Sequence, residues 1–350
     1  MTPETEPHPR RRVVRRVVLC AGVVLLGIAI WTARSTVHDA VVALGRADGA
    51  WIGAAFGLQV VVYIALGGML RRLQEPEGRL GWLTCSGVAL VVFGLGGIMP
   101  ASPAEGMTVA TIELNRRGMT SGRAAGTLVL SEWVRFLALA MLFAVDRVVA
   151  VLNGRALNTG VAPVIVSSMV MIGLVIGAAT FARSPRAADV ITRLANRVTR
   201  RHRGRDEVQR RGEAMHATVV RLLGSRTNRL VIAGWAAVGW VADAGCLALC
   251  VKALAARARD ELGIDAVLLA YVLAAAVAVV PFLPGGLGAV EVVVPTVMHR
   301  FGVPFDTALA ATLAWRGLSL IAPAIGGSFA LMALRRQATV PLAQRSPKAG

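Results

Sequence analysis

The stretch Pro281–Glu291, PFLPGGLGAVE, interrupts a long apolar part of the sequence with two prolines, three glycines and one carboxylate. In hydrocarbon every backbone polar group must be satisfied within the protein, so irregular backbone persists only where it is buried or lines a wet cavity. Proline removes an amide donor and glycine relaxes the chain. The stretch therefore predicts a broken helix, with a new helix that begins near Leu287 and directs its positive end into the protein.

The composition around this break is that of a membrane protein. Of the 350 residues, 55% are hydrophobic and only 17% are charged, which excludes a soluble enzyme. A bilayer core takes about 20 helical residues to cross. Long apolar runs occur at about 17–33, 51–70, 80–99, 124–145, 161–182, 230–251, 264–281 and 306–334. We therefore expect an all-α, polytopic transmembrane helical bundle of about eight long helices plus two short broken or re-entrant ones.

The net charge of +18 is concentrated in segments that suit the cytoplasmic face of a membrane. The segment 183–229 alone carries 13 arginines against 4 acids. An interfacial helix and a solvated basic loop both fit this segment, which could also bind a protein partner. Anionic membrane phospholipids are the expected partners of the chain, and nucleic acid is not expected.

The positive-inside rule places the basic N-terminus and the loop 183–229 on the same side, although five long runs separate them. A short helix at 101–115 would supply the missing crossing and leave both termini cytoplasmic, in a bacterial-type inner membrane. The predicted parts are a cytoplasmic tail (1–16), a first transmembrane half with its broken element near 100–118 (17–182), the Arg-rich loop (183–229), a second transmembrane half (230–335) and a second cytoplasmic tail (336–350).

The two short elements resemble each other in sequence. Each begins with a proline pair, at 100–103 and 281–284, and the alignment pairs Gly118 with Gly302 and Ala124 with Ala308. Because the charge distribution makes the two elements enter from opposite sides, we expect an inverted repeat. Paired interrupted segments of this kind point to the substrate site of a transporter.

Glu291 lies three residues after Gly288, and Arg316 lies in the middle of the last apolar run. An ionised acid in lipid costs a few kcal/mol at least, so Glu291 should be paired, and Arg316 is its natural partner. The pair could staple two helices, or Arg316 and the backbone amides could bind a lipid phosphate while Glu291 organises them. Asp243 is interpreted as a hydrogen-bonded structural acid. The predicted substrate-binding residues are Pro284, Gly285, Gly286, Gly288, Glu291 and Arg316, with Glu105 and Glu132 from the first half.

The chain shows no signal for a metal, a nucleotide or another cofactor. Its four cysteines lie in apolar runs without metal-type spacing, and no G-x-x-x-x-G-K-[ST] sequence occurs. We expect no cofactor and no enzymatic activity.

At these residues the sequence resembles a known family. The segment 279–327 is similar to the hallmark segment of the flippase-like transmembrane region of lysylphosphatidylglycerol synthases, whose P-G-G-x-G-x-x-E matches residues 284–291 and whose following Arg matches Arg316. In the first half Glu132 and Trp133 stand where such an Arg is expected, with Arg135 nearby. The resemblance covers about 15–335 and implies lipid handling without the synthetase domain.

These observations predict translocation of a phospholipid or lipid-linked head group between leaflets through a polar site near the midplane. A membrane-embedded transferase acting on a lipid-linked substrate remains an alternative, since acids and an Arg in a wet cavity also suit phosphate chemistry. A scaffolding membrane subunit that uses the loop 183–229 is a third interpretation.

Overall fold

Helices make up all the regular structure in the part of the chain that the structure describes. The structure is a computed structural model, and it describes residues 42, 45, 47–74, 79–95, 103–152, 225–254, 264–278, 286 and 288–338. These ranges contain no strand, which confirms the all-α fold class.

Four helical segments in the described ranges are long and apolar enough to span a membrane. They are α3 (Gly49–Arg72), Gly122–Val145 within α7 (Ser121–Leu152), α11 (Arg226–Leu254), and Phe305–Arg336, which α14 (Phe305–Arg316), the π-helix η4 (Gly317–Ile321) and α15 (Ala322–Ala338) form together. Each coincides with a predicted apolar run. The predicted runs 17–33 and 161–182 lie outside the described residues, as do residues 1–16, 183–224 and 339–350.

Shorter helices complete the described bundle. They are α4 (Trp82–Ala89), the π-helix η1 (Leu90–Leu95), α6 (Pro103–Asn115), α12 (Ile264–Ala278) and α13 (Val290–Arg300). The short helix expected at 101–115 is thus present as α6. The second short helix is α13, which begins at Val290 and not near Leu287, because the glycines before it hold the backbone in a turn.

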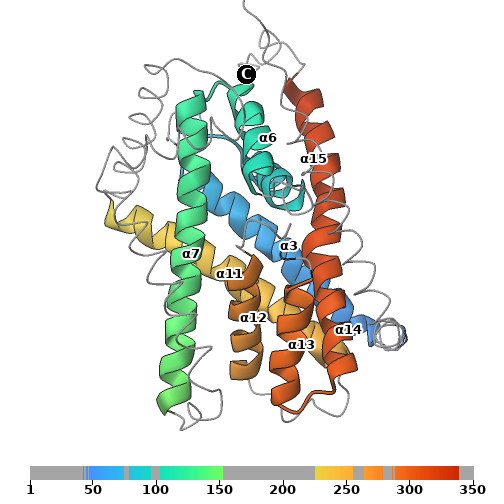
Figure 1. Cartoon of the computed structure of the whole chain (residues 1–350). Helices are drawn as coiled ribbons and strands as arrows, with labels where there is room; N and C mark the ends of the chain where they lie inside the picture. The colour runs from blue at the N-terminus through green and yellow to red at the C-terminus, as the bar shows by residue number, and fades with distance from the viewer. Residues whose placement is uncertain are drawn as a thin grey trace, which may run out of the picture.

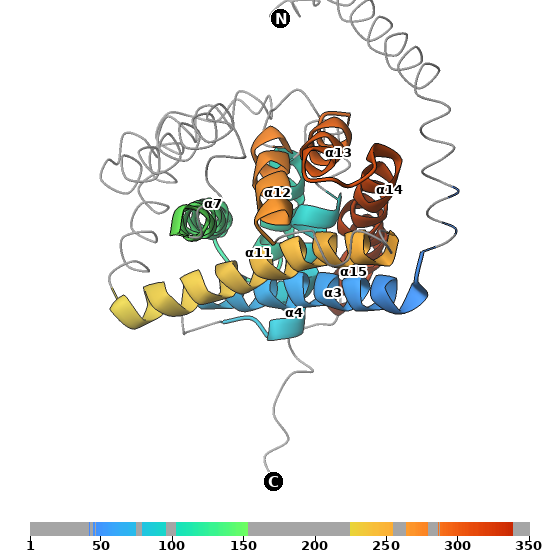
Figure 2. The same cartoon turned by 90° about the horizontal axis from the view of Figure 1, so that it is seen from below.

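Helices α3 and α11 form a long antiparallel pair, on which α7, α12 and α14 pack (Figure 2). The Asp48 amide at the start of α3 donates to the Ala253 carbonyl near the end of α11, at 3.1 Å. The Asp48 side chain also accepts from the Ala50 amide and caps α3. A buried cluster that includes Tyr271 and Trp315 joins α11, α12, α13 and α14, so this core positions the break and its neighbours.

Two helical hairpins, α6/α7 and α13/α14, share one turn geometry. Gly118 and Gly302 have φ values of 89° and 90°. Gly118 donates to the Asn115 carbonyl and Gly302 to the His299 carbonyl. In Figure 1 the α6/α7 turn lies at the top of the bundle and the α13/α14 turn at the bottom. The turns of the two hairpins therefore lie at opposite ends of the described part of the molecule.

Each half also contains a π-helix, η1 in the first and η4 in the second. A Cβ atom on Gly94 of η1 would lie 2.1 Å from the Pro323 carbonyl oxygen of α15, so only glycine allows these backbones to approach so closely. Pro323 has no amide hydrogen to continue the helix ladder, which favours irregular helix just before it.

Candidate functional site

The predicted break is a turn built on two glycines in the left-handed region. Gly286 has φ 70° and Gly288 has φ 86°, values that side-chain-bearing residues rarely adopt. Gly286 is also enclosed, because a Cβ atom there would lie 2.8 Å from a Val290 methyl and 2.9 Å from the Ala278 Cα. Gly288 faces open space. The prolines of the motif and Gly285 lie outside the described residues, so the predictions for Pro284 and Gly285 concern residues that the structure does not describe.

Glu291, in the first turn of α13, joins this turn to the last long helix. Its Oε2 accepts from the Gly288 amide at 2.7 Å, and its Oε1 accepts from Arg316 Nε at 3.0 Å. The first bond resembles the backward reach of a capping-box glutamate, and the second is charge-assisted. The two side chains are 18% and 12% exposed, so the pair is shielded without being sealed. The predicted pairing of Glu291 with Arg316 is confirmed as a contact.

Pro295 gives the start of α13 a further irregularity. It lies inside the helix, four residues after Glu291, and is buried. Because proline has no amide hydrogen, it cannot make the helical bond to the Glu291 carbonyl. Both the backbone carbonyl and the side chain of Glu291 therefore take part in the interruption of regular helix.

Arg316 ends α14 directly before η4, and the preceding residue, Trp315, leads to a second polar centre. Asp243 Oδ1 accepts from Trp315 Nε1 at 3.0 Å and from Gln59 Nε2 at 2.9 Å, and Asp243 Oδ2 accepts from the Tyr271 hydroxyl at 2.7 Å. All three donors are buried. The structure thus gives Asp243 the hydrogen bonds that the sequence predicted, and through Trp315 it anchors the helix that carries Arg316.

In the first half Glu132 is paired on its own helix. Its Oε1 accepts from Arg135 Nη1 at 3.3 Å. The Arg135 guanidinium lies over the Phe93 ring, 4.3 Å from the centroid, and 4.9 Å from the Trp240 centroid. Glu105 lies in the first turn of α6, but its side chain is outside what the structure describes. The structure therefore brings Gly288, Glu291 and Arg316 together and places Glu132 in a separate pair.

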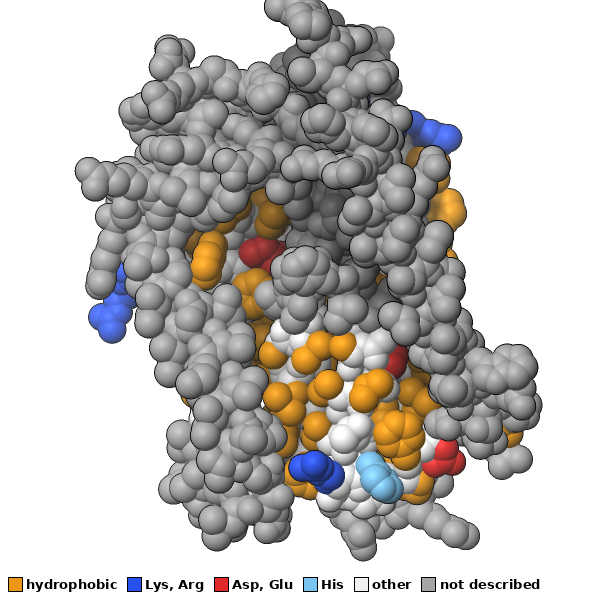
Figure 3. Space-filling model, in the orientation of Figure 1, with side chains coloured by type: hydrophobic (Ala, Val, Ile, Leu, Met, Phe, Trp, Pro, Cys, Tyr) orange, Lys and Arg blue, Asp and Glu red, His pale blue; other side chains and the backbone are white. Residues whose placement is uncertain are grey.

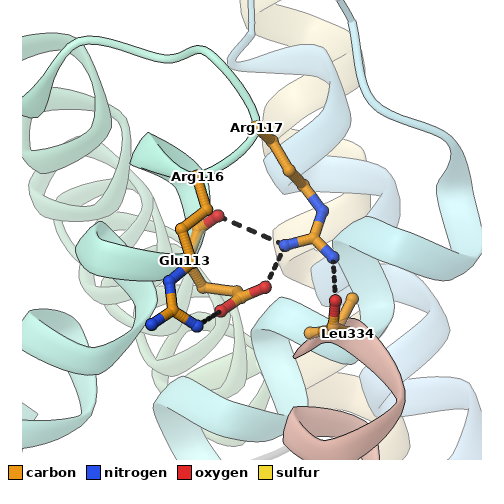
Figure 4. Close-up of polar contacts among 4 residues, drawn as sticks. All are labelled: Glu113, Arg116, Arg117 and Leu334. Carbon is orange, nitrogen blue, oxygen red and sulfur yellow. Dashed lines mark hydrogen bonds and ion pairs between the residues drawn. The ribbon is translucent and has the colours of Figure 1, made fainter. Parts of the chain in front are cut away.

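A third ionic cluster closes the α6/α7 turn against α15 (Figure 4). The Glu113 carboxylate, whose side chain is 2% exposed, pairs with Arg117 and with Arg116. Arg117 Nη2 donates to the Leu334 carbonyl at 2.9 Å, and Arg117 Nη1 donates to the Glu113 carbonyl at 3.2 Å. This cluster lies at the end of the bundle, whereas Glu291 and Arg316 lie at the break.

The surroundings of these polar groups are those of a lipid-facing protein. On the face seen in Figure 3 the described surface is largely hydrophobic, with acidic side chains set within it. Large apolar side chains such as Phe56, Phe329 and Met332 are at least half exposed. Among the described residues no group of three His, Cys, Asp or Glu side chains could hold a metal ion.

A protein family matches most of the chain. A model of the lysylphosphatidylglycerol synthase TM region matches residues 18–327. The chain belongs to this family. The matched range includes every predicted site residue, and no curated protein matches the chain. This member of the lysylphosphatidylglycerol synthase TM region family, with its several membrane-length helices, is a multi-pass membrane protein.

The sequence did not single out the neutral partners of Asp243 or the aromatic rings around Arg135. Gln59 and Tyr271 carried a usable signal, because each is a polar side chain near the middle of an apolar helix. Trp240 and Trp315 carried none, since tryptophan is common in membrane helices.

Proposed function

We propose that the protein moves an anionic phospholipid or lipid-linked head group between leaflets, and that Gly288, Glu291 and Arg316 form the centre of its head-group site. The main support for this proposal is that the Glu291 carboxylate, at the start of a short helix, accepts hydrogen bonds from both the Gly288 amide and Arg316 Nε. A guanidinium matches a phosphate group in shape and charge, and Glu291 holds it in one orientation. Pro284, Gly285 and Gly286 are the other proposed residues of this site, and Glu105 and Glu132 are those of the first half of the path.

An inverted repeat around this site is part of the proposal. The hydrogen bond from Met119 to Leu114 in one turn corresponds to that from Val303 to Met298 in the other, in the register that pairs Gly118 with Gly302. In the same register Ala124 and Ala308 are both fully buried. Rocking of two such halves about a midplane site is a known route to alternating access.

The membrane topology proposed with this function follows from charge. We place both termini and the loop 183–229 on the cytoplasmic side of a bacterial-type inner membrane, because arginine-rich segments remain there. The loop would then meet anionic lipids or a protein partner.

Leaflet exchange of a fluorescent anionic phospholipid in proteoliposomes, read with an outside-only quencher, tests the function. We expect wild type to exchange the lipid and Glu291→Gln to slow exchange at least about tenfold, because the charge-assisted bond that orients Arg316 is worth about 1.5–3 kcal/mol. Asp306→Asn is the matched control, since Asp306 is an exposed first-turn acid on the adjacent helix.

Exchange no faster than in empty liposomes, with several anionic head groups, would reject lipid translocation and favour the lipid-linked transferase. Wild-type exchange that survives Glu291→Gln would reject the site at Glu291 and Arg316 while leaving lipid translocation in place.

A further inference from the structure

Arg135 is the basic residue nearest the centre of the span Gly122–Val145. A charge at that depth is expensive and is usually paired or functional. Two aromatic rings contact its guanidinium, Phe93 from η1 at 4.3 Å and Trp240 from α11 at 4.9 Å. Trp240 Nε1 also donates to the Arg135 carbonyl at 2.6 Å. Backbone and side chain of Arg135 are thus held by the same tryptophan.

Among the described residues, few hydrogen-bond acceptors contact this guanidinium. Its one hydrogen bond to a described residue runs from Nη1 to Glu132 Oε1 at 3.3 Å, although a guanidinium has five N–H donors. None of its nitrogens is a buried atom without a partner, and the side chain is 18% exposed. The Phe93 and Trp240 rings lie against the guanidinium carbon, so a ligand would have to reach the N–H groups that these rings do not cover.

The arrangement matches the second-half pair in chemistry and depth of burial. Arg135 and Glu132 are 18% and 19% exposed, against 12% and 18% for Arg316 and Glu291. A line of contacts joins the two pairs: Trp240 packs edge-on against Tyr271, Tyr271 packs against Trp315, and Trp315 precedes Arg316.

We propose that Arg135, framed by Phe93 and Trp240 and balanced by Glu132, is a second head-group site that binds the phosphate ester of an anionic phospholipid. The inference rests on the proposed function and adds a site in the first half to the one at Glu291 and Arg316. A lipid is the expected source of the phosphate, because the site lies at mid-span within an apolar surface.

Equilibrium binding of radiolabelled dioctanoyl phosphatidylglycerol to the purified full-length chain in detergent tests the second site. We expect wild type to bind two molecules, and Arg135→Gln and Arg316→Gln each to weaken one of them by roughly tenfold to a hundredfold. Arg123→Gln, which changes an exposed arginine on the same helix, should bind as wild type does. Wild-type binding of a single molecule that Arg135→Gln leaves unchanged would overturn the second site and leave the first intact.

Glu132→Gln supplies a test that does not depend on the folding of the Arg135 variant. Removal of the competing carboxylate should tighten binding at this site several-fold, whereas a merely structural pair would leave binding unchanged. Equal displacement by free sn-glycerol 3-phosphate would overturn the assignment to a lipid. If the protein binds two lipids but does not exchange lipid between leaflets, the proposed function is rejected and the second site is retained.

Discussion

Gly286 and Gly288 share a backbone conformation but have different surroundings. Both lie in the left-handed region, yet a side chain at 286 would meet Ala278 and Val290, whereas one at 288 would meet open space. Glycine is therefore required at 286 both because of its φ value and because its neighbours leave no room for a side chain. At 288 glycine is required only because of its φ value.

Substitution by alanine should separate these requirements. We expect Gly288→Ala to destabilise the protein by about 1–2 kcal/mol, the strain of a left-handed residue. Gly286→Ala should add about 1–3 kcal/mol of overpacking to that strain. Thermal unfolding in detergent measures both, and equal losses would contradict the close packing of Gly286.

Asp243 accepts hydrogen bonds from three buried donors. Asparagine keeps the shape but replaces one acceptor oxygen with an NH2 donor, so the N–H or O–H hydrogen of at least one of Gln59, Tyr271 and Trp315 loses its acceptor. A buried unsatisfied donor costs about 1–3 kcal/mol. Asp243→Asn should lower the unfolding temperature accordingly, and an unchanged temperature would show that the network adds little stability.

The sequence predicted ionic side-chain contacts better than contacts between neutral side chains. The pairing of Glu291 with Arg316 could be predicted from the sequence, because a charged side chain in an apolar run needs a partner of opposite charge. Gln59 and Asp243 are 184 residues apart, and a neutral amide carries no comparable demand. Which apolar helix faces another was not encoded in any local pattern, so the Asp243 network needed the three-dimensional structure.

Small residues set how closely neighbouring helices approach each other. A Cβ atom on Gly67 of α3 would lie 2.0 Å from Ser86 Oγ and 2.7 Å from the Ser86 amide nitrogen of α4. Gly53, on the same helix, has nothing within 4 Å. The two glycines are chemically identical but only one lies at a helix contact.

We expect Gly67→Ala to cost about 1–3 kcal/mol, because α4 would have to move away from α3. Gly53→Ala is the matched control and should be neutral or stabilising, since alanine is the better helix former. Detergent-solubilised yield and unfolding temperature report the difference. Similar behaviour of the two variants would contradict the α3/α4 contact.

The apolar runs predicted the four described long helices, and the proline pairs predicted the short helices α6 and α13. The runs 80–99 and 264–281 were also expected to form long helices, but within them the structure describes the shorter helices α4, η1 and α12. The π-helices were not predicted, because a π-helix has the composition of an α-helix and only Gly94 and Pro323 hint at the distortion. The start of α13 was placed too early because glycine at 286 and 288 signals a break without giving the residue at which helical geometry resumes.

The α6/α7 and α13/α14 turns lie at opposite ends of the described part of the molecule (Figure 1). Single cysteines at the exposed positions Thr120 and Pro304, in a chain freed of its native cysteines, should react with a membrane-impermeant thiol reagent from opposite sides of the membrane. Sided labelling of oriented vesicles measures this. Labelling of both cysteines from one side would reject the inverted arrangement, whatever the transport activity.

The bond from Arg117 to the Leu334 carbonyl, across 217 residues of sequence, has a consequence for biosynthesis. At roughly 5–20 residues per second, the ribosome delivers Leu334 roughly 10 to 40 s after Arg117. During that interval Glu113, which lies four residues earlier on α6, is available as an acceptor for the Arg117 guanidinium. During synthesis the first half is therefore expected to stay in the membrane without the contact between its α6/α7 turn and α15 until α15 has been synthesised.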